Sequence, residues 1–130
     1  MNRLTNKELK EFFIEKQKLI ESQEVSKGLC EYLTQLSENG GDSETITSLN
    51  GDIQKLQKKI DLIKKELGVK ADAVKYTLGF VDDDTARSAL MLHYYEGLAW
   101  EMVAAILKSK EECIKSLSYR HLKNSRKKDV

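Results

Sequence analysis

A line of apolar residues through the middle of this 130-residue chain constrains its fold more than any other feature. Heptad spacing, with alternate steps of three and four residues, places one apolar seam along an α-helix, which then packs against another helix. The chain contains no proline, so nothing in its composition interrupts long helices. We therefore expect an all-α fold built on a seam formed by Ile46, Leu49, Ile53, Leu56, Ile60, Ile63 and Leu67.

The seam predicts a helical hairpin over residues 1–81 that serves in oligomerisation or as a spacer. Its helix begins near Ser43, and the spacing continues as far as Val81. An earlier helix is predicted over residues 6–36, where Thr5-x-x-Glu8 matches a capping box and the break falls at residues 37–41. Either this helix or a second copy of the chain covers the seam, and we expect a homo-oligomer.

The segment 82–130 predicts a second domain, a helix-turn-helix with a basic tail. One of the three acids at positions 82–84 caps a helix over residues 85–95, and Gly97 supplies the left-handed position after it. A short helix follows, with Val103, Ala104 and Leu107 facing inward. Ser109-x-x-Glu112 is a second capping box, which starts the last helix at position 110 or 111.

The last helix is expected to have one buried and one exposed stripe. The buried stripe consists of Cys113, Ile114, Leu117, His121 and Leu122. The opposite stripe consists of Glu111, Glu112, Lys115, Ser116, Ser118, Tyr119 and Lys123. Residues 108–130 carry a net charge of +5 and the rest of the chain carries −4. This asymmetry favours an anionic partner bound at one end, and the alternative is a solvated tail.

Residues 90–122, LMLHYYEGLAWEMVAAILKSKEECIKSLSYRHL, resemble region four of the sigma-70 family of RNA polymerase sigma factors. The segment is still more similar to the small phage late-transcription regulators of the ArpU and RinA type. The resemblance covers about a quarter to a third of the chain, and it implies a module that places its last helix in the major groove of DNA. It depends on Leu92, Tyr94, Glu96, Gly97, Leu98, Trp100, Glu101, Val103, Ala104, Ile114, Leu117 and Leu122.

The resemblance implies that Glu111, Glu112, Lys115 and Ser116 face DNA. Glu112 then accepts from a cytosine amino group or serves only in its capping box, and Lys115 reaches a guanine edge or a phosphate. The chain departs from the family pattern with an acid at Glu111, and with Lys108 and His93 in place of a glycine and an arginine. Phosphate contacts are therefore the safer expectation. The predicted DNA-binding residues are Lys110, Glu112, Lys115, Ser116, Tyr119, Arg120, Lys123, Arg126 and Lys127.

Composition and spacing give no support for an enzyme, a cofactor or a metal site. Cys30 and Cys113 form no metal-ligand or disulfide pattern, so we interpret both as small buried side chains in a cytoplasmic protein. His93 and His121 are isolated from each other, and three consecutive aspartates cannot converge on one ion. No stretch approaches the ~18 apolar residues of a membrane span.

The first hypothesis is a DNA-binding transcription regulator of phage or mobile-element type, with double-stranded DNA and RNA polymerase as partners. Two alternatives stay open. A helical adaptor that binds protein is favoured by Glu111, Glu112 and the near-neutral total charge. A packaging subunit of the small-terminase kind also joins a helix-turn-helix to an oligomerising helical segment, although its DNA module usually comes first.

Overall fold

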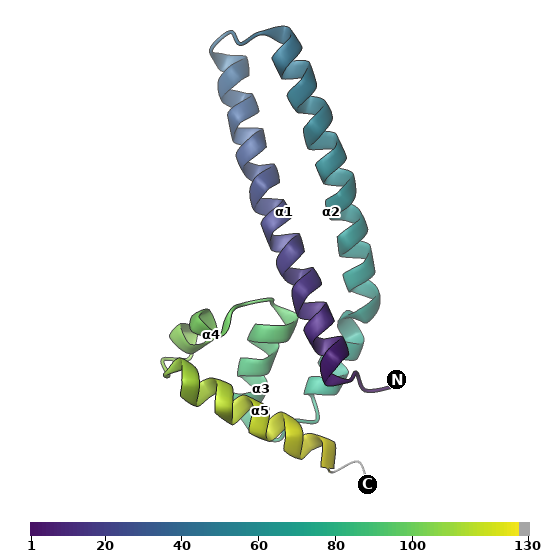
Figure 1. The fold of residues 1–130 in the computed structure, drawn as a ribbon, viewed down its shortest axis with the longest axis vertical. Coiled ribbons are helices and arrows are strands. Elements are labelled where there is room, and N and C mark those ends of the chain that lie inside the picture. The colour runs from purple at the N-terminus through teal and green to yellow at the C-terminus, as the bar shows by residue number, and fades with distance from the viewer. Residues whose placement is uncertain (128–130) are drawn as a thin grey trace. The chain divides into compact units, whose positions relative to one another are not determined.

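The computed structural model describes residues 1–127 and is all-α, as predicted (Figure 1). A long helical hairpin is followed by shorter helices. The predicted basic tail extends to Lys128, which lies outside the described residues. The helical elements are α1 (Asn6–Glu38), α2 (Ser43–Leu78), α3 (Asp84–Leu90), the π-helical turn η1 (Met91–Tyr95), α4 (Trp100–Ile106) and α5 (Glu111–Lys127).

The chain forms two compact units, and each is described by itself. One unit is the outer part of the hairpin, Lys18–Glu66, which we call the arm. The other, which we call the base, joins Met1–Gln17 to the described part of the chain from Leu67 to Lys127. The base therefore combines the first turns of α1 and the last turns of α2 with the shorter helices, from both sides of the predicted boundary at position 81.

In the arm, α1 covers the heptad seam of α2, so the seam closes within one chain. Ile60 and Ile63 are buried, and the seam positions closer to the tip are half-buried. On α1, Leu19 and Ser26 are buried against this seam. Ser26 is buried although it is polar, and its small side chain needs little space.

The ends of the hairpin helices follow the predicted signals. The Glu8 amide donates to the Thr5 hydroxyl at 3.1 Å, and the Thr5 amide donates to the Glu8 carboxylate at 3.0 Å, so the capping box is confirmed. These bonds lower the pKa of Glu8. Gly40 has a φ of 70°, the left-handed conformation that ends α1. Asp42 then accepts from the Thr45 amide at 3.3 Å, and α2 begins at Ser43 as predicted.

The base has a continuous apolar core. The last seam residues of α2 and the first apolar residues of α1 enter it, and α3, α4 and α5 complete it. Arg3 lies with its guanidinium 3.3 Å from the centre of the Phe80 ring and donates to the Ser125 carbonyl at 3.0 Å. The fully or almost fully buried apolar residues include Leu9, Phe12, Val74, Leu78, Val81, Ala86, Ala89, Leu90, Val103, Ile114 and Leu122.

The helix expected over 85–95 is present, as α3 to Leu90 followed by the π-helical turn to Tyr95. Two predictions about side-chain burial were wrong. Cys30 and Cys113 are both exposed, not buried. Ser118, placed on the exposed stripe, is completely buried, because its hydroxyl donates to the Ile114 carbonyl at 2.6 Å and needs no other partner.

Candidate nucleic-acid interface

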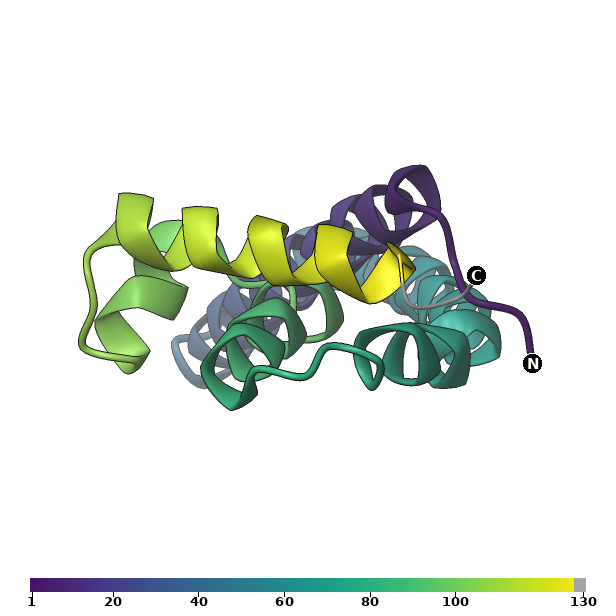
Figure 2. The ribbon, with the colours of Figure 1, turned by 90° about the horizontal axis from the view of Figure 1, so that it is seen from below.

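The junction between α4 and α5 forms a tight turn that holds both helices against one core. Val103 and Ala104 of α4 are buried, and α4 lies beside the first turns of α5 (Figure 2). Lys108 has a φ of 54°, the left-handed region that glycine adopts most easily. The Ser109 amide donates to the Ala104 carbonyl at 2.9 Å, which closes the turn. The last helix then begins at Glu111, within the predicted range.

One side of α5 is packed on α3 and α4. Ile114 and Leu122 are its buried apolar residues, and Ser118 and Ser125 fill the space between them. Each serine hydroxyl donates to a carbonyl of its own helix at 2.6 Å, so neither leaves a polar atom unpaired in the core. These four buried positions fix the rotation of α5 about its axis, so its opposite side faces solvent.

That opposite side carries five of the nine predicted DNA-binding residues in one line. Steps of four, four, three and four residues keep them on one face of the helix, and all five side chains are exposed. We call this line the α5 stripe. It begins with an acid and becomes basic toward the end of the helix. Its members are Glu112, Ser116, Arg120, Lys123 and Lys127.

The other four predicted residues lie outside the α5 stripe. Lys110 is exposed in the turn before the helix, and Lys115 is exposed at the side of α5. Tyr119 flanks the stripe and accepts from Nε1 of Trp100 at 3.3 Å, so its hydroxyl faces the core. Arg126 is half-buried and donates to the side-chain oxygen of Asn6 at 2.9 Å, which ties it to the start of α1.

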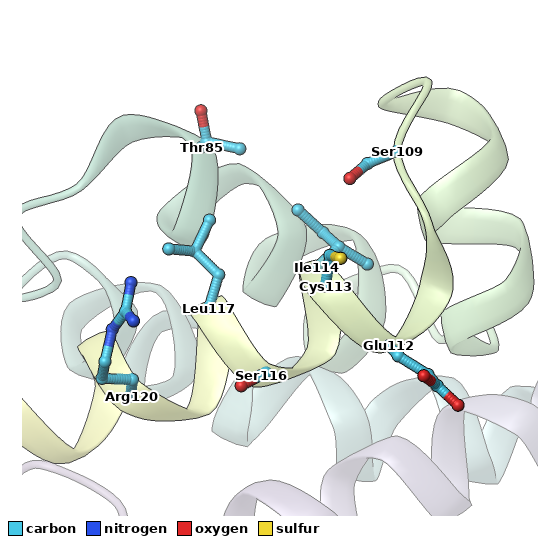
Figure 3. A pocket seen from close by; sticks show the side chains of 8 residues that line it. All are labelled: Thr85, Ser109, Glu112, Cys113, Ile114, Ser116, Leu117 and Arg120. Atoms are coloured by element: carbon cyan, nitrogen blue, oxygen red, sulfur yellow. The ribbon is translucent and has the colours of Figure 1, made fainter.

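Glu112 makes no capping hydrogen bond, which was the alternative to its predicted contact with DNA. Among residues 1–127, no hydrogen bond joins Ser109 to Glu112, although the helix starts where the capping box predicts. Glu112 points away from Ser109, and Ser116 also points away from the side chains of Ile114 and Leu117 (Figure 3). The carboxylate of Glu112 is thus exposed for contacts outside the chain.

A hollow of about 520 Å³ lies beside the α5 stripe. Arg120, Ser116 and Glu112 form part of its lining, and Thr85 at the start of α3 and the exposed Cys113 lie opposite or next to them (Figure 3). Thr85 was not among the predicted residues. Sequence spacing could not have found it, since Thr85 and Arg120 come together only through the packing of α3 on α5.

Behind the α5 stripe, His93 lies in a stack of aromatic rings. Its ring is 4.2 Å from that of Phe13 on one side and 4.2 Å from that of Trp100 on the other. Nδ1 donates to the Leu98 carbonyl at 2.7 Å, because a carbonyl oxygen can only accept. Burial lowers the pKa of His93 to about 4, with a smaller contribution from the positive charge of Lys115. His93 is therefore neutral at pH 7 and serves as a packing residue.

Comparison with known proteins adds no family or relative to this description. No protein-family model, curated protein or solved structure matches this chain. Within residues 1–127, no three His, Cys, Asp or Glu side chains are grouped to hold a metal ion. Over the same range, no helix combines the length and the apolar character needed to cross a membrane.

Proposed function

We propose that this protein is a DNA-binding transcription regulator of phage or mobile-element type, which places α5 in the major groove of double-stranded DNA. The observation that carries the proposal is the α5 stripe, a solvent-facing line of polar and basic side chains on a helix whose other side is packed. A helix held in this way after a tight turn can enter the major groove, which is about 12 Å wide. The resemblance of residues 90–122 to sigma region four supports the same reading.

Electrostatics gives most of the binding energy in this proposal. Lys115, Arg120, Lys123 and Lys127 approach phosphates at the two walls of the groove, and Lys110 adds a contact from the turn. Such contacts hold the helix in register without reading bases. Glu112 and Ser116, at the start of the α5 stripe, are the residues that face base edges. RNA polymerase is the second proposed partner. In this proposal the protein binds DNA and RNA polymerase in the cytoplasm.

Binding to a fluorescent DNA duplex across a salt series tests the proposal. We expect the logarithm of the affinity to fall with the logarithm of the salt concentration, with a slope that implies about four neutralised phosphates. The double variant Lys115→Ala/Lys123→Ala should bind at least about tenfold more weakly and lower that slope by about two. The matched control is Lys58→Ala/Lys65→Ala, which removes two exposed lysines of α2 and should bind like the parent chain.

Absence of binding near 50 mM salt, or equal loss in both double variants, contradicts the proposal. The first result favours a protein-binding adaptor, a reading supported by the acids Glu111 and Glu112 at the start of α5. A large ring of subunits in solution favours a packaging subunit instead. Circular dichroism of each variant shows whether its fold is intact.

A further inference from the structure

One face of the arm is exposed but has the pattern of a helix-packing surface. On α1, the residues Glu21, Val25, Gly28 and Tyr32 follow each other at steps of four, three and four. On α2, an exposed line with the same alternation lies next to the closed seam. Large apolar side chains are more than half exposed in both lines: Val25 54%, Tyr32 52% and Leu62 57%. The α2 line consists of Ser48, Asp52, Lys55, Lys59 and Leu62.

The two lines lie on the same face of the arm. Tyr32 of α1 lines a hollow together with Ser48, Leu49 and Asp52 of α2. The helix bounds give the register of the two helices. Counting equal numbers of residues back from Glu38 at the end of α1 and on from Ser43 at the start of α2 puts Tyr32 level with Leu49, which lines the same hollow. By this register, Val25 is level with residue 56. We call the surface formed by both lines the arm face.

Charge along the arm is divided into two blocks. Residues 28–54, around the tip, contain the acids Glu31, Glu38, Asp42, Glu44 and Asp52 and no lysine, arginine or histidine. The eleven residues that follow, 55–65, contain five lysines and a single acid. Asp52 and Lys59 represent these blocks on the arm face. They lie two helical turns apart on α2, too far to pair within one chain.

Gly28 is not required by any contact within the chain. It lies in the interior of α1, where glycine is less favourable than alanine, and a Cβ at this position would meet nothing within 4 Å. Its conformation is helical and needs no glycine either. A glycine between Val25 and Tyr32 does leave a flat surface, onto which the backbone of another helix can pack closely.

We propose that two copies of this chain pair antiparallel through the arm face, with α1 against α1 and α2 against α2. A two-fold axis at the level of residues 55 and 56 places Asp52 of each copy opposite Lys59 of the other. The same axis places Leu62 of each copy level with Leu49 of the other, over the hollow lined by Tyr32. Val25 meets its own symmetry mate at the axis. One axis thus brings together the Asp52–Lys59 pairs, the hollow and the exposed apolar residues. It also places the two copies of Lys55 beside each other, where their long side chains extend into solvent.

Charge selects the antiparallel arrangement. In a parallel pair, the acidic tips of the two copies would face each other, and so would the two lysine blocks. Like charges held opposite each other destabilise an interface, whereas the antiparallel pair brings Asp52 of each copy to the lysine block of the other. The pairing involves the arm alone and does not depend on the proposed binding of DNA by the base.

Sedimentation velocity over a concentration series, with the full chain, tests the pairing. The parent chain should dimerise reversibly, and more weakly as salt is raised. Asp52→Lys and Lys59→Asp should each weaken the dimer at least about tenfold, because each places like charges opposite each other. An equimolar mixture of the two variants should dimerise again, since both contacts of the heterodimer then join a lysine of one chain to an aspartate of the other.

Recovery in the mixture cannot come from contacts within one chain, because each chain carries only one change. A parent chain that stays monomeric up to about 100 µM overturns the proposal. So does a mixture that associates no better than its components. In either case, a different protein becomes the candidate for the arm face.

Cysteine cross-linking provides a second measurement that does not depend on charge. In a Cys30→Ser/Cys113→Ser background, Val25→Cys should give a disulfide-linked dimer under mild oxidation, since two copies of position 25 meet at the axis. Lys27→Cys, two residues further along α1 and therefore on a different side of the helix, is the matched control and should stay monomeric. Equal cross-linking at both positions contradicts the antiparallel arm face.

Discussion

The rings of His93 and Trp100 lie almost parallel, with their centres 4.2 Å apart and an angle of 15° between their planes. Phe13 stacks on the other side of the His93 ring, and Tyr119 meets Trp100 edge-on at 5.5 Å. Four helical segments, α1, η1, α4 and α5, therefore share one aromatic cluster. This cluster fixes the orientation of α5 within the base, and it explains why Trp100 is almost fully buried.

Acid should unfold the protein through His93. Its pKa is about 4 in the folded chain and about 6.5 when the side chain is free in solution, so the unfolded chain binds the proton more tightly. The contribution of His93 to stability is complete above pH 6.5 and is lost as the pH falls toward 4. We expect the free energy of unfolding to decrease by about 2 to 3 kcal/mol over this range, as measured by urea denaturation.

The histidines allow a matched control for this pH dependence. His121→Gln removes the other histidine of the chain and leaves the His93 stack in place, so it should retain the loss of stability between pH 6.5 and 4. His93→Leu keeps an apolar side chain in the stack but has no group to protonate, and should show a flatter profile despite a lower stability at pH 7. A steep profile in His93→Leu would assign the acid sensitivity to another group.

Tyr119→Phe separates a role in the core from a role in DNA binding. The substitution removes the oxygen that accepts from Nε1 of Trp100 at 3.3 Å, and a buried donor left unpaired costs about 1 kcal/mol or more. Burial and the neighbouring Tyr119 raise the pKa of Tyr94. Tyr94 is therefore neutral both in the parent chain and in the Tyr119→Phe variant. Thermal denaturation should show the loss, while affinity for duplex DNA should not change. Reduced affinity with unchanged stability would place the hydroxyl at the DNA instead.

Lys108→Gly should stabilise the turn between α4 and α5. Lys108 has a φ of 54°, which costs a side-chain-bearing residue on the order of 1 kcal/mol relative to glycine. We expect a gain of about 0.5 to 1 kcal/mol in the free energy of unfolding. Lys110→Gly removes the same charge at a position without positive φ and should give no gain, so equal effects would show that charge and not backbone strain is responsible.

Gly28→Ala should have opposite effects on the fold and on self-association. Alanine in an exposed helix interior is more favourable than glycine by about 0.5 to 1 kcal/mol, so the helix should gain stability. The added methyl groups should weaken the antiparallel dimer. Gly68→Ala is the matched control, because Gly68 is also helical with nothing within 4 Å of its Cβ position but lies outside the arm face. Thermal denaturation and sedimentation of both variants give the comparison.

Local sequence signals predicted the framework of the fold. The heptad seam, the Thr5–Glu8 capping box, the break at residues 37–41 and the left-handed Gly97 each depend on a few neighbouring residues, and the structure has all of them. The π-helical turn could not be predicted in this way. Its residues, Met91–Tyr95, have the same apolar pattern as an α-helix, and the change of pitch accompanies the seating of His93 between Phe13 and Trp100.

The exposed side of α5 was predicted better than its buried side. Long charged side chains such as Lys123 and Lys127 lie at the surface almost regardless of context. Small residues follow no such rule. Ser118 is buried because its hydroxyl bonds to its own helix, whereas Cys113 is exposed because position 113 falls at the edge of the packed side. Thr85 joined the site only through the packing of α3 against α5.

The closed seam of the arm also has a consequence for how such a protein can vary. Each seven-residue block of α2 packs on the stretch of α1 level with it, so removing one block from each helix leaves the remaining pairs in register. The tip then moves by about 10 Å, and every other contact keeps its geometry. An insertion or deletion of two or five residues would rotate the apolar line away from its partner. Relatives of this chain should therefore have arms whose lengths differ by multiples of seven residues.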